Sequence, residues 1–146
     1  MKQASFFLFL LICSCSQTPT KDLVRLDRYG VGPAPEEQIR VNVFLTEACS
    51  ICDRQVQVLK ECIVAENVAA FLEGKNEDHL RKVVRRKSLP FATYLLTDSV
   101  KKTYGFSGRS PALAIRTKNG HVFREGLQEC EEIIRIIKIG TNERSI

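Results

Sequence analysis

Apolar residues follow two patterns along the chain, short continuous runs and stripes at helical spacing. Three apolar runs, typical of buried strands, occupy residues 41–45, 68–72 and 91–96. Two further strands are predicted at 112–116 and 121–124, because Asn119-Gly120 between them is a strong hairpin signal. The runs therefore predict one sheet with several strands and a hairpin late in the chain.

The stretches between these strands carry apolar residues at helical spacing. A helix is predicted from Cys52 onward, with its apolar side formed by Val56, Leu59, Ile63 and Val64. A second helix is predicted at 76–87, where Leu80, Val83 and Val84 form an apolar stripe. A short helix is expected at 99–104, ended by Gly105, and a last helix at 128–139. This order predicts an α/β sandwich with a parallel and an antiparallel half.

The N-terminal segment departs from this pattern. Lys2 precedes an apolar run at 6–12, which is too short to span a bilayer and is typical of an export signal. The run ends in Ile12-Cys13-Ser14-Cys15, which resembles the lipobox of bacterial lipoproteins. The resemblance implies a signal peptide at 1–14 and lipidation of Cys15, whose acyl chains would anchor the protein to a membrane. An ordinary cleaved signal peptide is the alternative.

Composition divides the remainder of the chain. Residues 15–38 are rich in glycine and proline and predict a tether, with an edge strand at 23–26. Residues 39–140 form one domain of ordinary size, and 141–146 form a tail. The net charge of +5 reflects basic residues concentrated at 81–87, which we expect on a solvated helix face. Aromatic and basic residues do not alternate along the chain, as they would in a protein that binds single-stranded nucleic acid.

Two cysteines, Cys49 and Cys52, lie between the first predicted strand of the domain and the helix that follows it. A helix N-terminus presents unpaired N–H groups and the positive end of the helix dipole, so a thiol placed there ionises more easily. Cys49 would then be the nucleophile, and Cys52 would resolve the mixed disulfide by attacking Cys49. Half of a zinc site is the alternative, but Cys62 and Cys130 do not supply a second close pair.

The order of elements, the Cys49-Ser50-Ile51-Cys52 junction and the segment 104–111 before the hairpin strands resemble the thioredoxin fold. The chain is most similar to its exported thioredoxin-like and redoxin branch, which includes relatives of alkyl hydroperoxide reductase and thiol-specific antioxidant. The resemblance implies a three-layer α/β/α sandwich with a mixed sheet. It also implies that Pro111 is a cis-proline and that the backbone of Ser110 pairs with an extended substrate.

Several residues depart from the family pattern. Ala48 stands where many thioredoxins have tryptophan, and neither Glu47 nor Asp53 can be assigned as a proton-shuttling acid; Asp53 is expected to cap the helix. The short segment before the first strand predicts that the N-terminal hairpin of many redoxins is absent. In the thioredoxin fold the helices with Cys62 and Cys130 share one face, so either a disulfide or two buried thiols is expected.

Three other functions stay open. Thr46 fits a peroxiredoxin, but Asn42 stands where these enzymes need proline. Copper-delivery proteins of this fold pair two cysteines with a histidine, whereas His79 and His121 are expected at the surface. The Cys49 and Cys52 pair could also be a structural disulfide in a non-enzymatic module.

The sequence therefore predicts a membrane-anchored thiol:disulfide oxidoreductase of the bacterial cell envelope, facing the periplasm or the exterior. Its expected partners are protein thiols and disulfides, an electron donor and the membrane, with no nucleic acid. No dissociable cofactor or metal is required, because the dithiol itself carries the two electrons.

Overall fold

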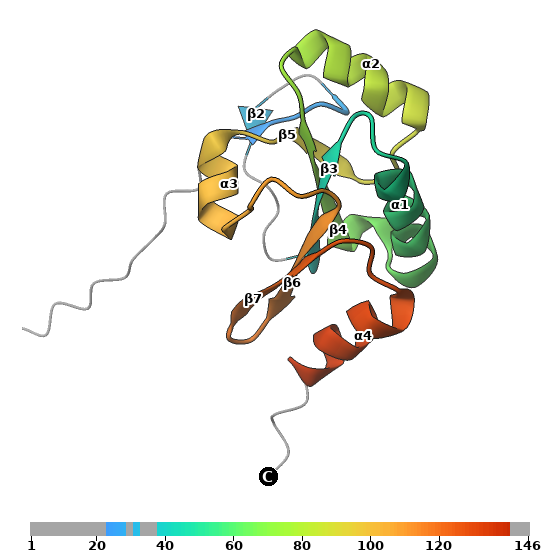
Figure 1. Cartoon of the computed structure of the whole chain (residues 1–146), viewed down its shortest axis with the longest axis vertical. Coiled ribbons are helices and arrows are strands. Elements are labelled where there is room, and N and C mark those ends of the chain that lie inside the picture. The colour runs from blue at the N-terminus through green and yellow to red at the C-terminus, as the bar shows by residue number, and fades with distance from the viewer. Residues whose placement is uncertain (1–22, 29–30, 33–37, 141–146) are drawn as a thin grey trace, which may run out of the picture.

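The computed structural model describes residues 23–28, 31–32 and 38–140 (Figure 1). The predicted signal peptide at 1–14, the predicted lipidation site Cys15 and the predicted tail at 141–146 lie outside this part of the chain. Of the helices in the described residues, none has the length and apolar character needed to cross a bilayer.

The main sheet of the described residues has five strands in the order β5-β4-β3-β6-β7. Their bounds are β3 (Val41–Thr46), β4 (Val68–Glu73), β5 (Ala92–Leu95), β6 (Ala112–Thr117) and β7 (Gly120–Glu125). β3, β4 and β5 run parallel, whereas β6 is antiparallel to both β3 and β7. The prediction of a parallel and an antiparallel half is therefore confirmed, and β3 is the central strand.

Helices cover both faces of the sheet (Figure 1). Their bounds are α1 (Ser50–Cys62), α2 (Glu77–Lys87), α3 (Asp98–Tyr104) and α4 (Cys130–Ile139), with a short 3₁₀ turn, η1, at Ala65–Asn67. One core cluster joins apolar residues of α1, α2 and α4 to the sheet, and a second cluster includes Val100 of α3. The predicted three-layer α/β/α sandwich is therefore confirmed.

Successive side chains of β3 point to opposite faces of the sheet, so this strand contributes to both core clusters. Val41, Val43 and Leu45 belong to the cluster beneath α1, α2 and α4. Phe44 faces the opposite way and stacks on Phe71, with ring centroids 5.5 Å apart, and on Phe106 at 5.1 Å. Because β3 is buried on both faces, its position is fixed up to the residues that lead into α1.

The helix predicted from Cys52 begins two residues earlier and ends sooner than its apolar spacing indicated. α1 ends at Cys62, and Ile63 is its extended C-terminal cap. Val64 is 64% exposed, so the prediction that it continues the apolar side of the helix is wrong. The chain leaves the helix at this point in order to pass through η1 into β4.

The segment before β3 is more ordered than the sequence indicated. β1 (Leu23–Val24) pairs antiparallel with β2 (Val31–Gly32), so the expected absence of an N-terminal strand pair is wrong. Arg25 forms an antiparallel bridge to Tyr94 on β5, which agrees with an edge strand near 23–26. Leu26 is only 2% exposed. Part of the region predicted as a tether therefore packs on the domain.

Two charged side chains hold this segment in place. The Arg81 guanidinium donates to the backbone carbonyls of Leu26 (3.4 Å) and Arg28 (2.9 Å) and to the carboxylate of Glu77. Arg81 is consequently buried, which corrects its predicted place on the solvated face of α2. Asp27 accepts from the guanidinium of Arg25 at 2.7 Å and from the backbone N–H of Thr93 at 3.3 Å.

These contacts make the attachment of the segment depend on pH. Burial opposes ionisation of Asp27, but the hydrogen bonds and charge of Arg25 outweigh it and lower the pKa of the Asp27 carboxyl below its usual value. A carboxyl with a lowered pKa in the folded state stabilises the fold above its unfolded pKa of about 4, and this contribution disappears as pH falls through the folded pKa.

We predict that Asp27→Asn lowers the free energy of unfolding by about 1 kcal/mol at pH 7, because the charge-assisted bonds to Arg25 are weakened. At pH 3, below the unfolded pKa of about 4, the difference between the variant and the parent should shrink, because the unfolded parent then carries a proton that folding must remove. Urea denaturation at the two pH values measures both. The control is Glu66→Gln, which removes one charge from an exposed residue of η1. An equal difference at both pH values would contradict the prediction.

Candidate active site

The two cysteines of the predicted site lie where the central strand enters α1. Cys49 is the N-cap of the helix, with extended backbone dihedral angles of φ −142° and ψ 99°. Its Sγ accepts a hydrogen bond from the backbone N–H of Cys52 at 3.1 Å. In this position the sulfur replaces the side-chain oxygen that usually caps a helix, and it faces the unpaired N–H groups of the first turn.

Cys49 and Cys52 form a disulfide with their Cα atoms 5.1 Å apart. Cys52 is 2% exposed and belongs to the core cluster, whereas Cys49 is partly exposed. Ile51 between them is 54% exposed. The pair thus has an outer sulfur that another molecule can approach and an inner sulfur that only Cys49 can reach easily, as the proposed order of attack requires.

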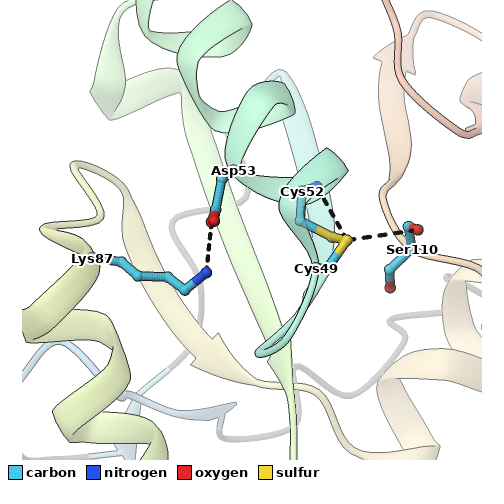
Figure 2. Close-up of a disulfide and its surroundings, with 5 residues drawn as sticks. All are labelled: Cys49, Cys52, Asp53, Lys87 and Ser110. Carbon is cyan, nitrogen blue, oxygen red and sulfur yellow. Dashed lines mark hydrogen bonds and ion pairs between the residues drawn. A yellow bond between two sulfur atoms is a disulfide. The ribbon is translucent and has the colours of Figure 1, made fainter.

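The predicted substrate-binding residues, Ser110 and Pro111, lie beside this disulfide. Their peptide bond is cis, as the resemblance implied. The carbonyl oxygen of Ser110 faces Cys49 Sγ at 4.0 Å (Figure 2). In the disulfide this is a contact only, since Sγ carries no hydrogen; in the reduced form the thiol could donate to the carbonyl. The Ser110 hydroxyl is buried and has no hydrogen-bond partner in the part of the chain that the structure describes.

The two acids near the pair are held by basic residues of α2. Glu47 lies 2.6 Å from Nε2 of His79 and 3.8 Å from the guanidinium of Arg86. Asp53 pairs with Nζ of Lys87 at 2.6 Å (Figure 2). The prediction that Asp53 caps the helix is wrong, because Cys49 occupies the cap and Asp53 lies within the first turn. Each carboxylate has a nearby cation, so it opposes a negative charge on Cys49 less than an unpaired carboxylate would.

Gln55 is a buried polar residue that the sequence analysis did not single out. It lies three residues after Cys52 in α1 and is 0% exposed. Its side chain forms two hydrogen bonds to the backbone of Gln128. The available signal was its spacing, because Cys52, Gln55, Val56 and Leu59 lie on one side of a helix and Gln55 is the polar member of that set.

The other two cysteines of the domain are bridged. Cys62, the last residue of α1, forms a disulfide with Cys130, the first residue of α4, with Cα atoms 5.6 Å apart. The sequence left a bridge and two free thiols as alternatives, and the structure has the bridge. It joins two helices on the same face of the sheet at the end of α1 away from Cys49.

The two histidines considered for copper lie at the surface, as predicted. The side chain of His79 is 52% exposed and contacts Glu47. His121, on β7, packs edge-on against the ring of Tyr104 at a centroid distance of 5.3 Å. In residues 23–28, 31–32 and 38–140, no three metal-ligating side chains gather in a group. His79 thus lies against the carboxylate of Glu47, and His121 lies against the ring of Tyr104.

Similar proteins were found by comparison of structures but not by comparison of sequences. No protein-family model matches the sequence, and no curated protein gives a significant match. The exposed lipoprotein thioredoxin of Streptococcus pneumoniae is 18% identical, with a TM-score of 0.63 over 81% of this chain and 97% of that one. A thiol:disulfide interchange protein of the thioredoxin family from Chlorobium tepidum is 14% identical, with a TM-score of 0.61 over 82% and 91%.

A secreted Mycobacterium tuberculosis disulfide oxidoreductase, described as homologous to Escherichia coli DsbE, is 14% identical. Its TM-score is 0.59, and the match covers 84% of this chain and 95% of that one. At these identities the likeness establishes the thioredoxin-like fold. The matches span nearly the full length of the solved chains, so the chain has the whole fold and not a fragment of it.

We predict that the Cys62 and Cys130 disulfide contributes more to stability than the Cys49 and Cys52 disulfide. The first links residues 68 apart and the second residues 3 apart. By the entropy of loop closure, the double variant Cys62→Ser/Cys130→Ser should lose about 4 kcal/mol of unfolding free energy. The matched control Cys49→Ser/Cys52→Ser should lose about 2 kcal/mol or less. Urea denaturation compares the two, and equal losses would be evidence against the prediction.

Proposed function

We propose that the protein is a thiol:disulfide oxidoreductase that acts on protein substrates at the extracytoplasmic side of a bacterial membrane. The observation that carries the proposal is the position of Cys49 Sγ. It caps α1, accepts from the Cys52 N–H and lies opposite the Ser110 carbonyl, in a residue that is partly exposed. A sulfur in this place combines the access that a nucleophile needs with the electrostatic environment that favours its thiolate.

The reaction requires only the two thiols and the substrate disulfide. The Cys49 thiolate attacks one substrate sulfur, forms a mixed disulfide and releases the other substrate sulfur as a thiolate. Cys52, after losing its proton, attacks Cys49 Sγ and releases the remaining substrate thiolate. The substrate gains two electrons and, with two protons from the thiols or solvent, becomes a dithiol, while Cys49 and Cys52 become a disulfide. The reverse sequence oxidises a substrate dithiol.

The surface around Cys49 suits an extended polypeptide substrate. The Ser110 carbonyl faces the sulfur, and Pro111 directly precedes β6. An extended chain lying along this segment would bring its cysteine to Cys49 while its backbone N–H bonds the carbonyl, as in strand addition to a sheet edge. Ile51, exposed between the two cysteines in sequence, offers an apolar contact. No dissociable cofactor is required.

Location and anchoring rest on the N-terminal sequence. The Ser14-Cys15 pair after the apolar run supports lipidation of Cys15, and we propose that the chain is tethered to the cell envelope by this residue. Two of the structural neighbours are an exposed lipoprotein thioredoxin and a secreted disulfide oxidoreductase, which agrees with an extracytoplasmic place of action. Within the thioredoxin-like proteins we assign the chain to the exported redoxin-related branch, on the residues that lead to Pro111.

The first experiment measures the redox potential of the Cys49 and Cys52 pair. The full chain is equilibrated with glutathione or dithiothreitol buffers, and its thiols are alkylated and counted by mass. We predict a reversible transition between about −300 and −100 mV that disappears in Cys49→Ser, since working oxidoreductases fall in this range. A pair that stays oxidised far below it would show a structural disulfide and end the enzyme proposal. Thiols that resist oxidation and bind copper would favour metal delivery instead.

The anchoring proposal has a matched control in the sequence itself. When the full chain is produced in a bacterium, we predict that it fractionates with membranes and that Cys15→Ala moves it to the soluble fraction, because multiple acyl chains are lost. Cys13→Ala, which changes a cysteine two residues away, should leave it in the membrane fraction. A soluble parent protein would favour the ordinary cleaved signal peptide.

A further inference from the structure

The buried amide of Gln55 connects α1 to the segment between β7 and α4. Its Nε2 donates to the carbonyl oxygen of Gln128 at 3.1 Å, and the backbone N–H of Gln128 donates to its Oε1 at 2.7 Å. Because a backbone N–H can only donate and a carbonyl can only accept, this pairing fixes the orientation of the amide. A fully buried amide is costly unless both ends are bonded, and here both ends bond one residue.

The connection continues from Gln128 to the residues beside the disulfide. The Gln128 side chain donates to the carbonyls of Glu125 (3.1 Å) and Gly126 (3.3 Å). The backbone N–H of Gly126 donates to the carbonyl oxygen of Pro111 at 2.8 Å. Pro111 follows Ser110, whose own carbonyl faces Cys49. A continuous path of hydrogen bonds therefore runs from α1 to the segment opposite the outer sulfur.

This path closes a ring around the site. One side of the ring is the first two turns of α1, with Cys49 at the cap and Gln55 three residues after Cys52. The other side is the chain from Gln128 through Gly126 to Pro111 and Ser110. The direct contact between the two sides at the site is the 4.0 Å approach of Cys49 Sγ to the Ser110 carbonyl. The gap into which a substrate must fit is thus bounded by two supports, the bonds on the opposite side of the ring and the pairing of β6 with β3, which places Ala112 opposite Phe44.

We propose that Gln55 is a positioning residue for the polypeptide substrate. It holds the Ser110 and Pro111 segment at the distance from Cys49 that lets an extended chain bond the Ser110 carbonyl while its sulfur meets Cys49. The inference rests on the proposed function. It assigns to Gln55 no contact with the reacting atoms, and its effect is confined to substrates that use the Ser110 backbone.

Other links between α1 and α4 do not substitute for Gln55. The Cys62 and Cys130 disulfide lies seven residues further along α1, about 10 Å from Gln55 along the helix axis. The ion pair of Arg54 with Glu129 is 3.7 Å long between two largely exposed side chains, so it adds little. The disulfide should nevertheless keep the helices together when Gln55 is replaced, which favours folded variants.

The test compares Gln55→Met with Gln57→Met in the full chain. Methionine has nearly the length of glutamine but leaves the Gln128 N–H and carbonyl without their partner. Gln57 is exposed on the same helix, so it controls for the substitution itself. Each protein is reduced, freed of reductant and mixed with a disulfide-bonded polypeptide, insulin, or with the small disulfide 5,5′-dithiobis(2-nitrobenzoate). The measured quantity is the ratio of the two second-order rate constants.

We expect Gln55→Met to lower this ratio about tenfold, because misplacement by a fraction of an ångström costs a positioned substrate far more than one that needs no positioning. Gln57→Met should leave the ratio unchanged. The ratio cancels changes in the reactivity of Cys49, since both disulfides meet the same thiolate. Hydrogen exchange gives a second readout: the Gly126 N–H should lose protection in Gln55→Met, whereas amides in the middle of β3 should keep theirs.

An unchanged ratio with Gly126 still protected would overturn the inference and leave the proposed function intact. A parent protein that reacts with neither disulfide would overturn both. If Gln55→Met does not fold, Gln55→Glu replaces it: its carboxylate still accepts from the Gln128 N–H but cannot donate to the carbonyl. That variant should lower the ratio less than tenfold but measurably, and a ratio equal to that of the parent would again overturn the inference.

Discussion

The hydrogen bond from the Cys52 N–H to Cys49 Sγ, at 3.1 Å, is the interaction on which the proposed chemistry depends. It exists because β3 is the central strand and delivers the chain to α1 at a fixed point, with Val56 and Leu59 of α1 packed in the core below. The fold thus places the Cys49 sulfur at the helix N-terminus, where a thiolate would be stabilised, and buries its partner Cys52.

Basic side chains of α2 contact the two acidic residues that flank the cysteine pair. His79 and Arg86 contact Glu47, which precedes the cysteine pair, and Lys87 contacts Asp53, which follows it. Arg81 on the same helix binds the N-terminal segment through the carbonyls of Leu26 and Arg28. Lys82, Arg85 and Arg86 remain exposed, as the sequence predicted for this face. Arg81 is the exception, because the N-terminal segment covers it and supplies carbonyl acceptors for its guanidinium.

The sequence predicted the fold wherever one local rule decided the outcome. Apolar runs located the strands of the sheet, Asn119-Gly120 located the hairpin, and Gly105 ended α3 in the left-handed conformation that its φ of 67° requires. The expectations failed where a distant contact decided. Val64 is exposed because the chain must turn toward β4, and the edge strand predicted at 23–26 has a partner that was not expected because β2 returns beside it. The pairing of Cys62 with Cys130 and the bonds of Gln55 to Gln128 likewise depend on how α1 lies against α4, which spacing within one helix does not report.

The same geometry bears on substrate choice. Ala48 and Ile51 are exposed beside Cys49, and the acids nearest the pair have cationic partners on α2, so the rim of the site offers no large aromatic surface and no unpaired carboxylate from these residues. A substrate held mainly by its backbone at Ser110 is selected by whether it can extend, since a carbonyl bonds every non-proline N–H equally well. A site of this proposed kind would accept cysteines in many sequences, provided that they lie in flexible or unfolded segments. Under the proposed role of Gln55, selectivity would come from the width of the gap between Cys49 and Ser110. The bonds of Gln55 to Gln128, together with the pairing of β6 with β3, would hold this width fixed.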